Sequence, residues 1–410
     1  DIFQKTKKTS SYFKYIYRHE KKMKLNGSDI IAEVLIEQGV DTIFGYPGGA
    51  VLNIYDALYK YRDKIHHILA AHEQGASHAA DGYARATGKS GVVIATSGPG
   101  ATNLVTGIAT AYMDSIPMVA ITGNVGTSYI GKDAFQEVYI TGITMPITKH
   151  NFFVSDIKEL APTLREAFKI ANSGRKGPVL VDIPKDVTAA ITEYEKAAPE
   201  VIIDNTVINE DEVKKAAALI NKAKRPVIEI GGGVVSSEAS DLVRMLVNKT
   251  GAPCCHTLMA AGVLGYSERL NYGLVGMHGS FVTNKAIDEA DVLVAIGTRF
   301  SDRVALNTNR FAHKAKVIQI DIDLSEIDKN VKVDHALVGD VKTIVMDLLH
   351  YVKQSDRTDW LKTLDEYKKS DYHPVDSDKF ITPHQLIRAI CENVPKDTVY
   401  VNDIVQHKKL

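Results

Sequence analysis

The sequence predicts an α/β protein with two successive domains, each built on a parallel sheet flanked by helices, and the beginning of a third. Two observations lead to this prediction. Short apolar runs alternate with longer helical patterns, and glycine-rich turns follow several of the apolar runs. Strands that alternate with helices favour parallel sheets, because each crossover helix returns the chain to the same edge. At 410 residues the chain is long enough for two or three such domains.

The first 22 residues differ from the rest of the chain. They are rich in lysine and aromatic residues, have no clean period, and precede Met23. We expect residues 1–22 to be a disordered leader, a translated upstream stretch or the edge of a fragment. A transit peptide is the other possibility, although it would contain more arginine than Arg18 alone.

The first domain is predicted over residues 23–187. Helical patterns separate its apolar runs, which we expect to be strands at 42–44, 68–71, 92–96, 118–122 and 179–183. The alternation stops after Pro184, and residues 188–208 are therefore expected to form a linker.

The second domain is predicted over residues 209–352 from the same alternation. Its expected strands lie at 226–230, 252–257, 292–297, 317–322 and 337–338. The polar stretch 353–379, which contains the only tryptophan, Trp360, is expected to be a second linker.

A third domain is predicted to begin at residue 380 and to run to residue 410. Its expected elements are a helix at 383–393 and a strand at 398–401. One helix and one strand cannot bury a core by themselves, so we expect this domain to be incomplete.

Composition excludes several classes of protein. The chain is 45% hydrophobic and 24% charged with a net charge of −1, which gives no reason to expect nucleic acid or an acidic membrane as partner. The three cysteines, of which Cys254 and Cys255 are adjacent and Cys391 is remote, indicate neither a disulfide framework nor a zinc site. They fit a reducing, cytoplasmic setting. No apolar run approaches the roughly 20 residues that cross a bilayer.

The motif with most chemical content is His72-Glu73-Gln74-Gly75-Ala76, at the junction of an expected strand and an expected helix over 75–87. A carboxyl group at the carboxyl end of a parallel strand faces the crevice where α/β sheets bind ligands. Partial burial against the apolar strand is expected to keep a proton available on Glu73. Alone, the same residue could simply complement the helix dipole.

Two glycine-rich turns accompany this glutamate, at 45–50 and 96–103. Glycine lets the backbone approach a ligand closely, and a helix start presents backbone N–H groups. Each turn by itself could be an ordinary strand-to-helix connection. Together with the glutamate, they resemble the pyrimidine-binding domain of thiamine diphosphate enzymes, and most closely that of the acetolactate synthase catalytic subunits.

The resemblance implies roles for particular residues of the first domain. Glu73 would protonate the aminopyrimidine ring of the cofactor, which then deprotonates its own thiazolium carbon. Phe135 and Gln136 would border the active site, and Lys185 would lie at the substrate entrance, where a cation suits a 2-keto carboxylate. Helix packing is the alternative for Phe135 and Gln136, and an ordinary surface lysine is the alternative for Lys185. The implied cofactor contacts are Tyr46, Pro47, Gly48, Gly49, Glu73, Pro99 and Asn103.

The second domain contains a glycine turn at 231–233 that is not Gly-x-Gly-x-x-Gly and is weak by itself. Further short motifs near the expected strand ends follow it in order, and the set resembles the Rossmann-like central FAD-binding domain of the same family. For any one Arg or Asp, a surface ion pair is the alternative. The implied FAD contacts are Arg175, Gly232, Gly233, Thr257, Leu258, Met259, Gly276, His278, Gly297, Arg299, Asp302, Arg303, Asp321, Ile322 and Asp340.

The family anchors the cofactor diphosphate through Mg²⁺ with a Gly-Asp-Gly motif, which this chain lacks. We therefore expect the Mg²⁺ site to lie outside the chain and no metal ligand within it. Residues 403–410 resemble the family segment that touches the diphosphate, through Gln406 and His407. Without the anchor, cofactor affinity should fall by roughly a thousandfold or more, so we expect this chain to be a catalytically incomplete fragment.

The activity implied by the resemblance is the condensation of two pyruvates to 2-acetolactate, or of pyruvate with 2-ketobutyrate, with release of CO₂ in branched-chain amino acid biosynthesis. A homodimer or tetramer is implied, and a regulatory small subunit is a further candidate partner. Related flavin-containing enzymes of the pyruvate oxidase or glyoxylate carboligase type are the alternatives. Glu73 argues against the carboligase, and the Phe135-Gln136-Glu137 segment argues against the oxidase. A non-catalytic flavin-binding fragment also stays open.

Overall fold

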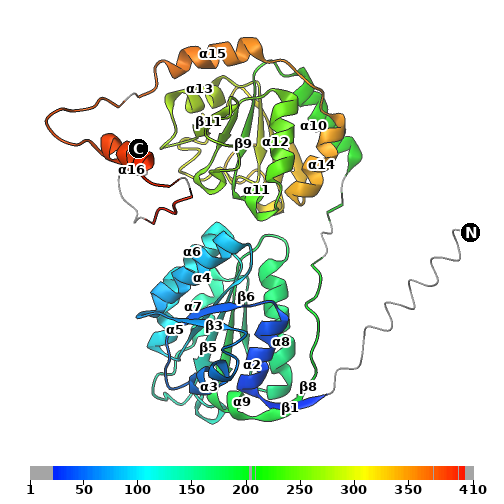
Figure 1. Cartoon of the computed structure of the whole chain (residues 1–410). Helices are drawn as coiled ribbons and strands as arrows, with labels where there is room; N and C mark the ends of the chain where they lie inside the picture. The colour runs from blue at the N-terminus through cyan, green and yellow to red at the C-terminus, as the bar shows by residue number, and fades with distance from the viewer. Residues whose placement is uncertain (1–21, 203–205, 208, 373, 396, 402–410) are drawn as a thin grey trace, which may run out of the picture. The chain divides into compact units, whose positions relative to one another are not determined.

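The computed structural model describes residues 22–202, 206–207, 209–372, 374–395 and 397–401. The chain divides into two compact units, Asp1–Asp204 and Asn205–Leu410. Each unit contains a six-stranded sheet in which all the pairs are parallel. Helices flank both sheets (Figure 1). The predicted α/β class with helix-flanked parallel sheets is confirmed.

The sheet of the first unit has the order β3-β2-β4-β5-β7-β6. The chain runs from β2 outward to β3 and then crosses to β4 on the other side of β2. The order therefore reverses between β2 and β4, which is where open α/β sheets place their ligand crevice. The strands are β2 (Thr42–Gly45), β3 (His66–Leu69), β4 (Gly91–Ala95), β5 (Met118–Asn124), β6 (His150–Phe153) and β7 (Pro178–Pro184).

Apolar clusters cover both faces of this sheet. On one face, Ile30 and Leu164 pack against Val181 and Ile94 of the strands. On the other face, the small residue Ala80 lets its helix lie close to the sheet. The helices are α2 (Gly27–Glu37), α3 (Leu52–Lys60), α4 (Glu73–Thr87), α5 (Pro99–Asn103), α6 (Val105–Asp114), α7 (Ile140–Thr144), α8 (Ile157–Asn172) and α9 (Lys185–Ala189), with 3₁₀ turns η1 (Thr127–Tyr129) and η2 (Met145–Ile147).

Part of the stretch expected as the first linker is built into the first unit. Strand β8 (Ile191–Tyr194) pairs antiparallel with β1 (Met23–Asn26). The buried carboxylate of Glu37 holds this segment in place, because it accepts from the Ala197 N–H at 2.9 Å and from Arg165 Nε at 2.9 Å. The sequence does not predict β8, because this strand is short and mostly exposed and therefore shows no alternation of apolar residues.

The sheet of the second unit has the order β11-β10-β9-β12-β13-β14. Read by position in the chain, this is the 3-2-1-4-5-6 order of a doubly wound sheet, with its switch point between β9 and β12. Buried Ile228, Val294 and Ile318 form the centre of one face, and Leu293 and Val317 belong to the other. The strands are β9 (Pro226–Ile230), β10 (Cys254–His256), β11 (Asn271–Leu274), β12 (Val292–Ile296), β13 (Lys316–Asp321) and β14 (His335–Val338).

The helices of the second unit follow their strands as the alternation predicts. They are α10 (Glu210–Lys222), α11 (Gly232–Ser236), α12 (Ser240–Thr250), α13 (Phe281–Glu289) and α14 (Val341–Tyr351), with 3₁₀ turns η3 (Leu258–Ala260) and η4 (Leu324–Glu326). No helix in the described ranges is long and apolar enough to span a bilayer.

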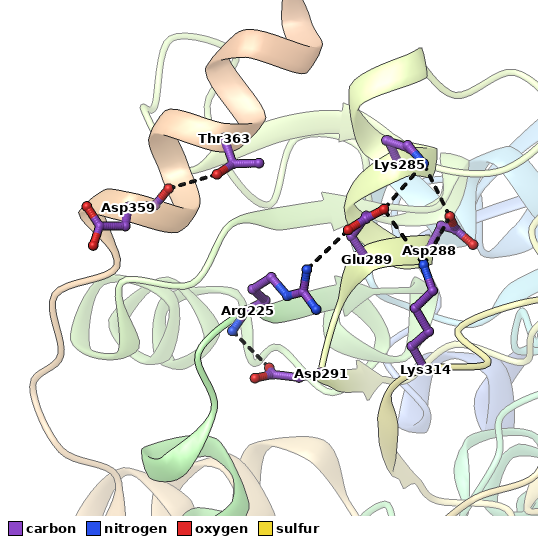
Figure 2. Close-up of polar contacts among 8 residues, drawn as sticks. All are labelled: Arg225, Lys285, Asp288, Glu289, Asp291, Lys314, Asp359 and Thr363. Atoms are coloured by element: carbon purple, nitrogen blue, oxygen red, sulfur yellow. Dashed lines mark hydrogen bonds and ion pairs between the residues drawn. The ribbon is translucent and has the colours of Figure 1, made fainter.

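The stretch expected as a second linker contains a helix, α15 (Thr358–Lys368), that packs on the second unit. Trp360 is 4% exposed and donates from Nε1 to the Pro226 carbonyl at 3.1 Å. Figure 2 shows the polar contacts beside it at the amino-terminal edge of the sheet, where Arg225 pairs with Glu289 at 3.1 Å and donates its backbone N–H to Asp291 at 2.9 Å. This stretch therefore belongs in large part to the domain.

The helix expected at the start of the third domain is present as α16 (Pro383–Asn393), which opens with a capping box between Thr382 and Gln385. The third domain itself stays a prediction. The strand expected at 398–401 is wrong, because these residues form no ladder. Val399 and Val401 are 83% and 94% exposed. Extended residues form a stable strand only beside a partner that satisfies their backbone groups.

Candidate functional site

Glu73 is the first residue of α4 and lies just beyond the carboxyl end of β3. The preceding His72 caps the helix, and its Nδ1 accepts from the Gln74 N–H at 3.1 Å. The side chain of Asn103, at the end of α5, donates from Nδ2 to Glu73 Oε2 at 2.9 Å. Glu73 is only 8% exposed. Two residues named from the sequence are thus brought together, and the amide fixes the orientation of the carboxyl group.

The two glycine-rich turns meet at Thr96, which the sequence did not single out as a site residue. A methyl group on Gly48 would lie 2.4 Å from Thr96 Cγ2, and one on Gly100 would lie 2.7 Å from the same atom. The Ala50 N–H donates to Thr96 Oγ1 at 3.1 Å. Since these turns follow β2 and β4, they line the two sides of the switch point. The only sequence signal for Thr96 is that it ends a strand just before a glycine turn.

Open space adjoins this contact. A methyl group on Gly49 would meet nothing within 4 Å, and one on Gly100 would lie 3.3 Å from Glu73 Oε1. Tyr46 is 41% exposed, and Pro47 and Gly49 are exposed beside it. Pro99 begins the short helix α5 that carries Asn103. The predicted contacts in the two turns therefore border one exposed edge, with Glu73 at its base.

The loop after β5 reaches the same place through Gln136. A methyl group on Gly98, whose φ is +62°, would lie 2.8 Å from Gln136 Cβ. Gln136 itself has φ +60°, and the neighbouring Phe135 is 87% exposed. Glu137 holds the loop by accepting from the backbone of Ala134 at 3.0 Å, and this bond together with one from Gly131 lowers its pKa. Gln136 thus lies against the turn that follows β4, while Phe135 projects into solvent.

Lys185 begins α9 directly after β7, at the same edge of the sheet. Its side chain is exposed, and its neighbour Asp186 accepts from the Thr127 N–H at 3.0 Å. Just below, Asp182 accepts from Asn124 Nδ2 at 2.6 Å, and burial raises the pKa of Asp182 to about 6. The buried carboxyl group fixes the start of the loop that carries Gln136. No motif in the sequence indicated this contact between Asp182 and Asn124.

Arg175 lies at the opposite edge of this sheet, because it precedes β7. Its Nε donates to Ser115 Oγ at 2.9 Å, next to the left-handed residue that ends α6. The FAD contact expected of Arg175 stays a prediction.

The second unit is expected to have its ligand crevice at the switch point between β9 and β12, where open α/β sheets place one. A methyl group on Gly297, whose φ is +59°, would lie 2.6 Å from Gly233 Cα, and one on Gly232 would lie 3.1 Å from Met259 Cβ. The Gly233 N–H donates to the Gly297 carbonyl at 3.0 Å. The turns after β9, β10 and β12 therefore converge at the switch point and pack closely against one another.

The turn after β11 joins this arrangement through Gly276. A methyl group there would lie 2.2 Å from the Arg303 carbonyl, and the Met277 N–H donates to that carbonyl at 2.8 Å. The other predicted contacts follow the carboxyl ends of the strands: Thr257 and Leu258 after β10, His278 after β11, Arg299 and Asp302 after β12, and Asp321 and Ile322 at β13. All of these follow the edge of the sheet to which the crevice opens.

Asp340 has a structural task of its own. Its side chain caps α14 by accepting from the Lys342 N–H at 2.9 Å and the Thr343 N–H at 3.2 Å. Its own N–H donates to Thr206 Oγ1 at 2.8 Å. Gln406 and His407, also named from the sequence, lie outside the described residues.

Comparison with known proteins identifies the family to which both units belong. Residues 25–143 match the description "Thiamine pyrophosphate enzyme, N-terminal TPP binding domain", and residues 213–348 match "Thiamine pyrophosphate enzyme, central domain". The first match contains Glu73 and both of its glycine turns. The second contains the crevice between β9 and β12.

Curated relatives cover almost the whole chain. A probable acetolactate synthase large subunit of Methanocaldococcus jannaschii is 46% identical over 94% of this chain and 67% of its own length. An acetolactate synthase of Mycobacterium leprae is 47% identical over 94% of this chain and 63% of its own length. An acetolactate synthase large subunit of Lactococcus lactis is 42% identical over 95% and 69%. The chain thus spans about two thirds of the length of these relatives, and it belongs to the acetolactate synthase large-subunit family of thiamine pyrophosphate enzymes.

Proposed function

We propose that this chain provides the pyrimidine-activating and dinucleotide-binding parts of an acetolactate synthase catalytic subunit. The reaction joins two pyruvates to 2-acetolactate, or pyruvate to 2-ketobutyrate, with release of CO₂. The observation that carries the proposal is the carboxyl group of Glu73, held by Asn103 at 2.9 Å beside the switch point of a parallel sheet. The relatives named as acetolactate synthases favour this reaction over the oxidase and carboligase alternatives.

The first crevice fits the aminopyrimidine ring of thiamine diphosphate. A methyl group on Gly49 would meet nothing within 4 Å, which leaves room for a flat ring beside the backbone. Gly48 and Gly100 pack on Thr96, and Gly100 lies next to the Glu73 carboxyl group. When bound, this cofactor supplies a carbon nucleophile that attacks a keto group and accepts the electrons left by CO₂. Glu73 would hold the proton at the ring nitrogen. Asn103 occupies Oε2, so Oε1 is the atom that would make this contact.

The acceptor keto acid would meet the residues beyond this ring. Lys185 is an exposed cation at the same edge and would attract the carboxylate of pyruvate or 2-ketobutyrate. Phe135 and Gln136 would shape the space above it, since Gln136 is tied to the Gly98 turn and Phe135 is exposed beside it. These three residues would position the substrate and exclude water, and none of them needs to exchange a proton.

The second crevice fits a dinucleotide, and we propose FAD. Gly233 and Gly297 pack against each other and Gly232 lies against Met259, so the turns after β9, β10 and β12 meet where a pyrophosphate would bind. Arg299 and Arg303 follow β12 and would make charge-assisted hydrogen bonds to it. Asp321, at the end of β13, would accept from a ribose hydroxyl. Mg²⁺ would accompany the diphosphate of thiamine, and we assign no residue of this chain to it.

Exposed apolar side chains around α6 and η2 support a further subunit as partner. Met113 is 60% exposed, Tyr139 73% and Met145 62%, and α6 packs against η2. Exposed apolar side chains on neighbouring elements favour association. We propose a homodimer or tetramer, and the name "large subunit" of the relatives adds a small subunit as a candidate partner.

The test is product analysis on a joined chain, in which this sequence is fused to the rest of the Lactococcus lactis relative. The joined chain would be supplied with pyruvate, thiamine diphosphate, Mg²⁺ and FAD. We expect acetolactate formation without oxygen consumption. Oxygen-dependent formation of acetate and peroxide would instead support an oxidase and would overturn the proposal.

A further inference from the structure

A row of polar side chains is buried beneath the second crevice. In the parallel register, Glu229 of β9 lies beside Ala295 of β12, which lies beside Gln319 of β13. All three are 0% exposed. Residues in register on neighbouring parallel strands point to the same face of the sheet. The side chains of Glu229 and Gln319 therefore stand on either side of a small alanine, and both are long enough to reach over it.

The hydrogen bonds of these side chains leave two acceptors unused. Thr298 Oγ1 donates to Glu229 Oε1 at 2.8 Å. Gln319 Nε2 donates to the backbone carbonyls of Thr298 at 3.2 Å and Glu326 at 3.5 Å, which fixes the orientation of its amide. Glu229 Oε2 and Gln319 Oε1 are both buried and have no hydrogen-bond partner among the residues that the structure describes.

We propose that Glu229 is protonated in the folded protein and that its Oε2 hydroxyl donates to Gln319 Oε1 across Ala295. One proton then satisfies both unused atoms. An ionised carboxylate would instead leave both buried acceptors without a donor, which is costly in a dry interior. No bond is made or broken except the O–H bond, whose proton comes from solvent during folding.

The surroundings favour the neutral form. Burial raises the pKa of Glu229 to about 7, against the opposing effect of the Thr298 hydrogen bond. The buried thiols of Cys254 and Cys255 on β10 interact electrostatically with Glu229. The neighbouring elements also carry Asp321, on β13, and Glu326, whose carboxylate pairs with Lys329 at 3.0 Å. Helices α13 and α15 cover this face with apolar side chains. A negative charge on Glu229 would thus lie among other acidic groups.

The neutral pair is placed to brace the crevice. Glu229 lies two residues before Gly231, where a methyl group would be 2.3 Å from the Gly297 carbonyl and 2.8 Å from Thr298 Cβ. Gln319 holds the carbonyls of the loops that follow β12 and β13. Glu229 is therefore a positioning residue that ties together the loops of three strands. This goes beyond the proposed function, because the pair forms whether or not the crevice binds FAD.

The pair makes the second unit sensitive to alkali. The ordinary pKa of glutamate, 4.5, applies to the unfolded chain, and the value near 7 applies to the folded one. The contribution to stability is therefore complete below about pH 4.5 and is lost as the pH rises through 7. The folding equilibrium constant should fall by roughly a hundredfold or more over this interval.

The test uses the sole tryptophan, Trp360, which packs on the same face of the sheet and reports unfolding of the second unit. Denaturant titrations followed by its fluorescence at pH 5 and pH 8 would compare the natural chain with Glu229→Gln. The amide keeps the shape and can donate to Gln319, but it cannot ionise. We expect the natural chain to lose roughly a hundredfold in folding equilibrium constant relative to this variant between the two pH values.

Parallel pH profiles for the two chains would overturn the proposal, since they would mean that Glu229 has the same charge in the folded and unfolded states. Infrared difference spectra at pH 6 add a direct measurement: the natural chain minus Glu229→Gln should show the carbonyl band of a protonated carboxylic acid. Absence of that band also contradicts the proposal. Should Glu229→Gln fail to fold, Glu229→Met, which is similar in length and cannot ionise, serves in both comparisons.

Discussion

The contact between Asn103 and Glu73 gives the most specific prediction for the first site. Asn103 Nδ2 donates to Glu73 Oε2 at 2.9 Å, and Glu73 is 8% exposed. A hydrogen bond to a charged or proton-sharing carboxyl group contributes about 1.5–3 kcal/mol. Asn103→Ala should therefore lower the rate of acetolactate formation by the joined chain by roughly 10- to 150-fold. The loss should appear in kcat, because the amide orients the carboxyl group for its contact with the cofactor.

A double-mutant cycle separates this effect from damage to the fold. If Asn103 acts through Glu73, then adding Asn103→Ala to Glu73→Gln should cost much less than adding it to the natural chain. Thr102→Ala is the matched control, because Thr102 is on the same short helix and its hydroxyl donates only to the Pro99 carbonyl, at 3.2 Å. Fully additive effects of the two substitutions would refute the reasoning.

Three further predictions concern the first unit. Gly48→Ala should weaken thiamine diphosphate binding in calorimetry and cost about 1–3 kcal/mol of stability, because its methyl group would lie 2.4 Å from a threonine side chain. The matched control Gly49→Ala should cost little stability, because its methyl group would meet nothing within 4 Å. Arg165→Ala should destabilise the first unit by roughly 3 kcal/mol in denaturant titrations, since Glu37 is buried and would lose its cation, and an unchanged midpoint would contradict this. Asp182 has its pKa raised from 3.8 to about 6, so stability should fall as the pH rises through 6. Asp182→Asn should remove that slope, and a slope that persists would count against a buried, protonated Asp182.

The strands and turns that carry the sites could be predicted from the sequence. The runs that became β4 and β12 are buried on both faces and contain only apolar residues and glycine, and those that became β5 and β9 are mostly apolar. The glycine turns after them were visible because no other residue permits such close backbone contact. Most of the residues named for the two switch points consequently follow the carboxyl ends of their strands, and their roles stay predictions.

The elements that were missed have weaker signals. β6 and β11 carry histidine, asparagine and glycine and are only partly buried at the edges of their sheets. α15 lies in a polar stretch, although its buried residues Trp360, Leu361 and Leu364 follow a helical spacing. An edge strand or a surface helix needs few apolar residues, so the apolar pattern of the sequence does not predict it.

Contacts between strands could not be predicted at all. Glu229 was visible as a charge inside an apolar run, yet its partner Gln319 is 90 positions away in the sequence and becomes its neighbour only through the register of three strands. Thr96 is similar, because its importance arises from two turns that pack on one side chain. One sequence specifies the period of each strand but not which residues will face one another.

The central claim is that Glu73 activates the thiazolium carbon through the aminopyrimidine ring. Exchange of the hydrogen on that carbon with deuterium, followed by magnetic resonance in the joined chain with bound thiamine diphosphate, measures the activation without any later step. Glu73→Gln should slow the exchange by roughly a hundredfold or more, while the Thr102→Ala control exchanges at the natural rate. Equally fast exchange in Glu73→Gln, with the cofactor still bound, would contradict the account.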